Sequence, residues 1–135
     1  MTSTATQKNN FADMPGYRAG ESDIRPWGMW EVMETGHENG EEYCVKTITV
    51  KPGGVLSLQS HDHRREEWTV VSGTLEVTRH DEIVVLQAGQ SIDIPQGAKH
   101  RMANRGEEPV VVKEIQRGLC REDDIIRYED IYGRS

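Results

Sequence analysis

From Glu41 onward, short runs of alternating apolar and polar residues are interrupted at regular intervals by glycine, proline and polar pairs. Alternation with a period of two is typical of strands that bury one face, and the interruptions are typical of turns. The pattern therefore predicts eight short strands, at residues 43–50, 55–61, 66–72, 74–78, 83–87, 91–94, 99–104 and 110–116.

Many short strands joined by glycine-rich turns favour an all-β sandwich or barrel of the jelly-roll type. We expect one domain at residues 24–135 after a polar, flexible leader at 1–23. Residues 25–30 hold two tryptophans beside a proline and a glycine, which predicts an extended or turn segment laid over apolar surface. The spaced isoleucines of 122–132 fit either a short helix or a turn followed by a strand.

The composition narrows the classes of partner. A chain of 135 residues with a formal net charge of −7 is poorly suited to bind nucleic acid or an anionic membrane surface. No apolar run approaches the length of a membrane span. The two cysteines, Cys44 and Cys120, are too few for a disulfide framework, which indicates a reducing compartment. We expect a cytoplasmic protein.

A first group of candidate metal ligands lies at residues 59–67. Side chains two residues apart on a strand share a face, so Gln59, His61 and His63 would point the same way. A carboxylate from the same hairpin would complete the group. Glu66 and Glu67 both qualify; strand parity favours Glu66 and directs Glu67 toward the rim or the opposite face.

A second group follows a turn about thirty residues later. Pro95 and Gly97 predict a tight turn that fixes the chain direction just before His100 enters its strand. Asn104 suits the end of that strand, where its side chain can bond to local backbone and hold the next turn.

Either group alone would be interpreted as surface histidines or as an ordinary turn, and the isolated His37 and His80 are expected to be solvated. Together the two groups offer three imidazoles and a carboxylate, which suit a divalent first-row metal. We therefore expect one divalent ion (Zn, Mn, Ni, Co or Fe) bound by His61, His63, Glu66 and His100.

These two segments resemble the paired motifs of the cupin superfamily. The second motif matches without change from Gly89 to Asn104. In the first, six residues instead of the usual five separate Gly54 from His61, and two instead of three or four separate His63 from Glu66. The resemblance implies the cupin double-stranded β-helix, which is a jelly-roll barrel.

Longer stretches look like type II phosphomannose isomerase, whose cupin domain commonly forms the C-terminal part of a bifunctional mannose-1-phosphate guanylyltransferase. The matching stretches are Arg-Pro-Trp-Gly at 25–28, the segment from Leu56 to Gly73, Ile94 to Arg101, and the tail at 122–134. Asp62 and Glu67 stand where that family usually has histidine. The resemblance covers only the isomerase part, so transferase activity is not implied.

The resemblance implies metal-dependent interconversion of mannose 6-phosphate and fructose 6-phosphate through an enediolate, with the metal as Lewis acid. Glu114 is the expected general base, with Glu67 as the alternative. Arg64 and Lys99 are the expected phosphate partners, and Gln59 is an additional metal or substrate contact.

Two other functions share the fold. The first is a non-catalytic, metal-bound cupin that binds a sugar or sugar nucleotide, which the unusual Asp62 and Glu67 favour. The second is an iron-dependent dioxygenase, ranked last because few aromatic residues are expected to face inward. The expected partners are a small phosphorylated sugar and, since lone cupin domains often dimerise, a second copy that contacts Trp27 and Trp30.

Overall fold

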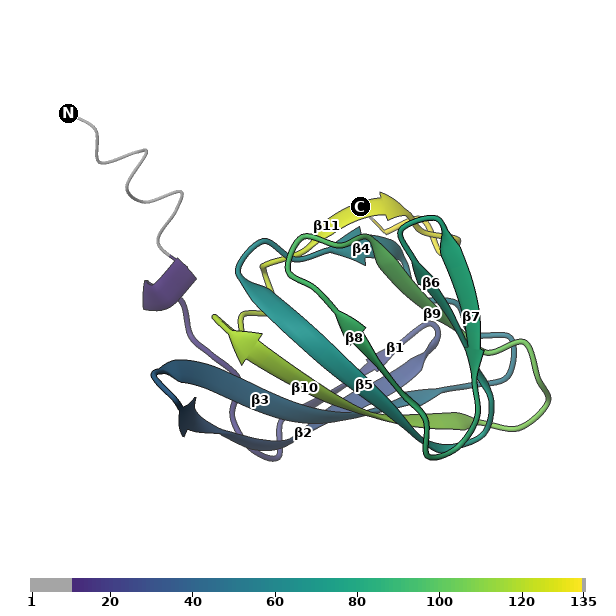
Figure 1. Cartoon of the computed structure of the whole chain (residues 1–135), viewed down its shortest axis with the longest axis horizontal. Helices are drawn as coiled ribbons and strands as arrows, with labels where there is room; N and C mark the ends of the chain where they lie inside the picture. Colours follow the sequence, from purple (N-terminus) through teal and green to yellow (C-terminus); the bar gives the residue numbers. More distant parts are fainter. Residues whose placement is uncertain (1–10, 135) are drawn as a thin grey trace.

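The computed structural model describes residues 11–134 and consists of two antiparallel sheets that face each other (Figure 1). A short 3-10 helix, η1 (Phe11–Asp13), precedes them. The first sheet has the order β1-β2-β3-β10-β5-β8 and contains β1 (Ser22–Arg25), β2 (Gly28–Glu38), β3 (Glu41–Val50), β5 (Arg64–Ser72), β8 (Ser91–Ile94) and β10 (Val110–Gly118). The second has the order β11-β4-β9-β6-β7 and contains β4 (Leu58–Ser60), β6 (Leu75–Arg79), β7 (Glu82–Leu86), β9 (His100–Ala103) and β11 (Ile126–Glu129).

The core lies between the sheets because the central strands bury alternate side chains. On β5 every second residue from Arg64 to Val70 is buried, and the residues between them are exposed or half-buried. Trp68 and Val112 of the first sheet and Leu75 and Met102 of the second are almost completely buried. Each apolar side chain of this kind stabilises the fold by roughly 1.5–3 kcal/mol. This two-layer, all-β architecture confirms the jelly-roll prediction.

Strand β10 positions much of the pocket wall. It runs between β3 and β5, so that Glu114 lies opposite Lys46 on one side and Trp68 on the other. The predicted strand at 55–61 is shorter than expected: β4 covers only Leu58–Ser60, with an isolated bridge at Val55. The other seven predicted strands are present: the strand at 91–94 has the predicted bounds, and the remaining six have shifted ends.

Both chain ends differ from the simplest expectation. The segment at 25–30 is the turn and strand start of the β1–β2 hairpin, in which Trp27 and Trp30 are buried. The C-terminal stretch contains a strand, β11, which settles the choice between helix and strand. Of the predicted leader, residues 1–10 lie outside the described part, whereas Tyr17 is buried against the core.

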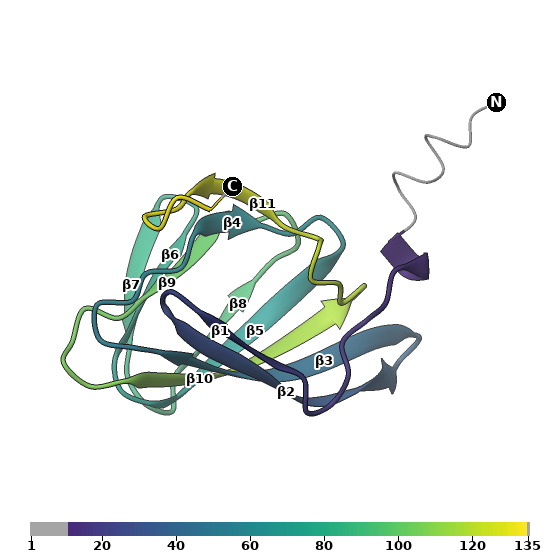
Figure 2. The same ribbon diagram turned by 180° about the vertical axis from the view of Figure 1, so that it is seen from behind.

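The connection between β10 and β11 crosses from one sheet to the other at one end of the barrel (Figure 2). Leu119 donates its backbone N–H to the His63 carbonyl at 2.8 Å, and the Tyr128 hydroxyl lies 2.9 Å from that of Ser60. Residues 119–134 therefore form part of the pocket's surroundings. No helix within residues 11–134 is long and apolar enough to cross a membrane.

Candidate active site

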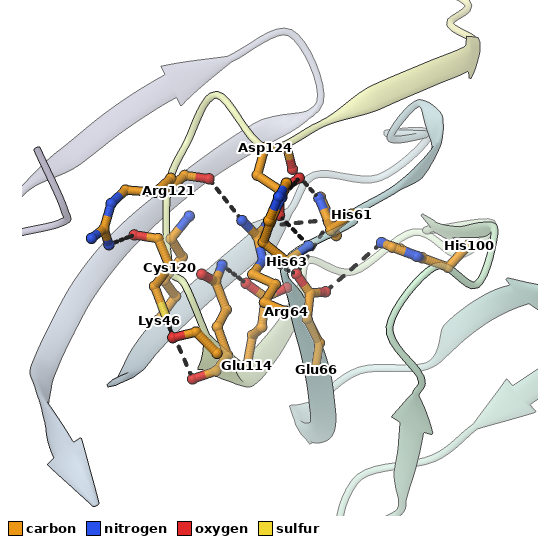
Figure 3. A network of polar contacts seen from close by, with 12 residues as sticks. Lys46, His61, His63, Arg64, Glu66, His100, Glu114, Cys120, Arg121 and Asp124 are labelled. Atoms are coloured by element: carbon orange, nitrogen blue, oxygen red, sulfur yellow. Dashed lines mark hydrogen bonds and ion pairs between the residues drawn. The ribbon is translucent and has the colours of Figure 1, made fainter. Parts of the chain in front are cut away.

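Two imidazoles and a carboxylate meet between the two sheets. His61 directly follows β4, His100 begins β9, and Glu66 projects from β5 on the opposite sheet. One ligand atom from each lies within 4.8 Å of the others, and all three residues are buried. Figure 3 shows His61 and Glu66 turned toward each other, with His100 reaching toward Glu66.

Hydrogen bonds fix both imidazole rings in the same tautomer. His61 donates Nδ1–H to the Asp124 carbonyl at 2.6 Å, and His100 donates Nδ1–H to the Ala98 carbonyl at 2.9 Å. Each Nε2 therefore carries a lone pair that is directed into the cluster. Burial lowers the pKa of His61 to about 4 and also lowers the pKa of His100, so both rings are neutral at pH 7. A neutral imidazole anchored through its other nitrogen is the usual form of a metal ligand.

The Glu66 carboxylate is ionised although it is buried. Burial alone would raise its pKa, but the surrounding imidazoles and the Arg64 guanidinium hold the pKa well below its ordinary value. Among these groups the Arg64 guanidinium carries a permanent positive charge and pairs directly with the carboxylate. Arg64 Nε donates to Glu66 Oε2 at 2.9 Å, and Trp68 Nε1 donates to Glu66 Oε1 at 3.0 Å.

The structure brings Gln59, rather than His63, to this cluster. Gln59 is paired with His100 across β4 and β9, and it lines the same pocket as His61 and Glu66. With Gln59 as the first position of the motif, the spacing between its residues is different. Five residues separate Gly53 from Gln59, one separates Gln59 from His61, and four separate His61 from Glu66. This spacing fits the first cupin motif without the departures noted above, with glutamine in place of its first histidine.

His63 lies on a different path because the chain bends after His61, and the expected common strand face does not exist. The Asp124 carboxylate causes the bend. It accepts the backbone N–H groups of Asp62 and His63 at 3.0 and 2.9 Å, and the His63 Nδ1 lies 3.2 Å from it. His63 therefore does not share a strand face with Gln59 and His61, contrary to the prediction.

The donor set itself fits a divalent ion. His100 Nε2 is buried and has no hydrogen-bond partner among residues 11–134, although it points into a polar cluster. A buried nitrogen of this kind is costly unless a cation or a donor meets it. With His61 and Glu66 it offers two nitrogens and a carboxylate oxygen, which suit the first-row divalent metals, and Gln59 lines the same pocket.

The turn before His100 holds the two halves of the site together. Gly97 donates its N–H to the His61 carbonyl at 2.9 Å, and the Gln96 amide donates to the Asp62 carbonyl at 2.6 Å. Asn104 donates to the carbonyls of Val50 and Glu108 and accepts the Gly106 N–H, which confirms its expected role in holding the local turn.

The cluster forms one wall of a pocket with about 600 Å³ of empty space, part of it open to solvent. Glu114 lines the same pocket and is buried. Burial, and after it the negative charge of Glu66, raises the pKa of Glu114 to about 7, while the Lys46 charge acts in the opposite direction. A carboxyl with a pKa near neutrality can both accept and release a proton.

The remaining predicted residues divide between the pocket and the surface. Arg64 is buried in the pocket wall. Glu67 is exposed on the outer face of β5, and the Asp62 side chain is also exposed. Lys99 is exposed, with its Nζ 4.2 Å from the centre of the Tyr128 ring, and it is not among the pocket's lining residues.

Four pocket cations were not predicted: Arg25, Lys46, Arg127 and Arg134. They come from the two ends of the chain and from β3, so no local spacing connects them. Lys46 is buried, with its Nζ 3.9 Å from the centre of the Tyr17 ring and 4.3 Å from that of Trp30. Only the alternation of β3, which places Lys46 between the inward residues Cys44 and Ile48, could have indicated its direction.

The fold and the donor cluster define a cupin. A cupin-superfamily sugar phosphate isomerase from Silicibacter pomeroyi has a similar structure, with a TM-score of 0.57 at 16% identity over 71% of this chain and 69% of that one. At this identity the likeness concerns the fold.

Sequence relatives define the family. The chain is 51% identical over 112 residues to the xanthan biosynthesis protein XanB of Xanthomonas campestris and 47% identical over 111 residues to the mannose-1-phosphate guanylyltransferase ManC of Salmonella typhimurium. Each match covers 82% of this chain but only 23% and 22% of the respective relative, so the chain spans less than a quarter of their length. The family described as mannose-6-phosphate isomerase C-terminal matches residues 16–130, and the chain belongs to it.

Proposed function

We propose that this domain interconverts a phosphorylated aldose and its ketose, mannose 6-phosphate and fructose 6-phosphate. The observation that carries the proposal is the position of Glu114, a carboxyl with a pKa near neutrality, in the same pocket as the His61–Glu66–His100 donor cluster. Membership of the mannose-6-phosphate isomerase C-terminal family supports the choice of sugar.

A divalent ion held by Gln59, His61, Glu66 and His100 would act as a Lewis acid on the substrate oxygens as carbon loses its proton. The protein groups supply the remaining chemistry. Isomerisation of the open-chain sugar moves one proton from C2 to C1 and one hydroxyl proton from the C2 oxygen to the C1 oxygen.

In this proposal Glu114 takes the proton from C2 and returns it to C1. It is positioned by the Gln116 amide, which donates to its Oε2 at 2.8 Å, and by the neighbouring strands β3 and β5. Lys46, opposite Glu114 on β3, counters the tendency of burial to keep Glu114 protonated. The pair therefore keeps the base available near neutral pH.

The substrate phosphate requires cations, and the pocket supplies them from segments far apart in the sequence. Arg127 on β11 is paired with Gln59 on β4, which places it beside the donor cluster. Arg25 and Arg134 line the same pocket and are each held by a carboxylate, from Glu122 and Asp130 respectively. Guanidinium groups bind phosphate in a bidentate manner, so these arginines replace Lys99 as the proposed phosphate partners.

A coupled assay tests the proposal by following fructose 6-phosphate formed from mannose 6-phosphate with Mn²⁺, Co²⁺, Ni²⁺ or Zn²⁺ added. We expect turnover, and a loss in kcat of about 100-fold or more in Glu114→Gln because general base catalysis is removed. The matched control is Glu67→Gln, which changes an exposed carboxylate on β5 and should leave kcat unchanged. Absence of turnover with all four metals would overturn the isomerase proposal.

A further inference from the structure

The Arg64 side chain lies inside the donor cluster. It is buried, and its Nε donates to Glu66 Oε2 at 2.9 Å. One of its terminal nitrogens lies 3.3 Å from His61 Nε2, the atom whose lone pair is directed into the cluster. Figure 3 shows Arg64 close to both His61 and Glu66, whose Nε2 and Oε2 atoms also lie 3.3 Å from each other. The guanidinium therefore occupies the same two acceptors, Glu66 and His61, that a metal ion would use as ligands.

The surrounding backbone holds Arg64 in this place. Its other terminal nitrogen donates to the Arg121 carbonyl at 2.8 Å. Gly118, its neighbour on β10, approaches so closely that an added Cβ would lie 2.9 Å from the Arg64 Cα. A side chain fixed by three polar partners and a packed backbone belongs to the interior of the site, unlike Arg65, which pairs with Glu41 on the surface.

Electrostatic repulsion opposes the presence of the Arg64 guanidinium and a divalent metal ion in the cluster at the same time. The Arg64 guanidinium already pairs with the Glu66 carboxylate, at 2.9 Å between Nε and Oε2. Entry of a divalent ion beside the retained guanidinium would place two further positive charges in a buried site, where repulsion is poorly screened. In addition, a lone pair that accepts an Arg N–H cannot bind a metal at the same time.

We propose that the Arg64 guanidinium is a built-in competitor of the metal, which must leave Glu66 and His61 before a divalent ion can bind there. Arg64 then stabilises the buried Glu66 carboxylate in the metal-free protein and lowers the apparent metal affinity. The inference rests on the metal site of the proposed function, but it does not require turnover.

Metal titration of Arg64 variants tests this inference without any activity measurement. The chelator-treated full-length chain is titrated with Co²⁺, whose visible absorption reports coordination. We expect Arg64→Met to bind Co²⁺ about 10- to 100-fold more tightly than the wild type, because a charge-assisted hydrogen bond no longer opposes binding. Arg65→Met is the matched control and should bind as the wild type does, since Arg65 contacts Glu41 at the surface.

Equal or weaker Co²⁺ binding by Arg64→Met would overturn the inference, because Arg64 would then support the site or be irrelevant to it. Circular dichroism and thermal unfolding check that the variant is folded before titration. If Arg64→Met does not fold without metal, Arg64→Lys replaces it: the shorter cation should bind Co²⁺ several-fold more tightly than the wild type, and unchanged or weaker binding would again overturn the inference. A chain that binds Co²⁺ as expected but lacks isomerase activity would contradict only the proposed function.

Discussion

The two halves of the donor cluster reach the same pocket by different means. The half that ends in His100 is set by a local turn, in which Gly97 has a φ of +82° and His100 begins the next strand immediately afterwards. The half that contains Gln59, His61 and Glu66 depends on a bend imposed by Asp124, more than fifty residues away. Local turn chemistry can be read from neighbouring residues, whereas a bend held by a distant carboxylate cannot.

Removal of individual histidines gives the largest expected effect. His61→Ala and His100→Ala should each weaken metal binding by more than about 100-fold, because each removes a ligand. Loss of a residue that only hydrogen-bonds to a ligand weakens metal binding by about 10- to 100-fold. His63→Ala should cost less than about tenfold, because His63 faces Asp124 instead of the cluster. Equilibrium dialysis with metal analysis measures all three. A loss in His63→Ala as large as that in His61→Ala would place His63 among the ligands.

The bend in the first half can be weakened through Asp124. Asp124→Asn should lower the free energy of unfolding by about 2 kcal/mol at pH 7, because two backbone N–H groups lose a charged acceptor. These bonds and the His63 contact hold the pKa of Asp124 below its ordinary value, against the effect of burial. The stabilisation is therefore present above the unfolded-state pKa and is lost as pH falls through the lower folded-state pKa.

Urea unfolding at neutral and acidic pH measures this difference between wild type and Asp124→Asn. The control is Asp123→Asn, since the Asp123 side chain is exposed beside it and should have little effect at either pH. A difference that persists unchanged into acid would show that the ionised carboxylate is not what holds the bend.

Of the histidine ligands, the bend held by Asp124 and the turn at Gly97, the turn should show the smallest effect on substitution. Gly97→Ala should cost about 1–2 kcal/mol, because alanine is strained at positive φ. An added Cβ there would meet no atom within 4 Å, so the cost is one of backbone conformation alone. Gly106→Ala, at a glycine without positive φ, is the matched control. Equal stabilities in thermal unfolding would mean that the turn does not depend on its left-handed residue.

Much of the fold followed from alternation and turn residues, since one of the eight predicted strands has the predicted bounds and six others needed only changes at their ends. The strand predicted at 55–61 was shortened mainly at its start, where Val55 forms only an isolated bridge and β4 begins at Leu58; at its other end His61 leaves the strand just before the bend at Asp62. The hairpin formed by β1 and β2 was only partly anticipated: its second strand continues to Glu38 through polar residues without clear alternation.

The sequence by itself determined the two-sheet barrel, the turn that presents His100, and the choice of Glu66 over Glu67 as the inward carboxylate. These depend on contacts close along the chain and on the twofold period of a strand. Only the tertiary structure decided that Gln59 and not His63 lines the pocket, that Arg64 contacts both Glu66 and His61, and that arginines from both chain ends line the pocket. Those positions depend on partners brought together by folding, and no spacing along the chain encodes them.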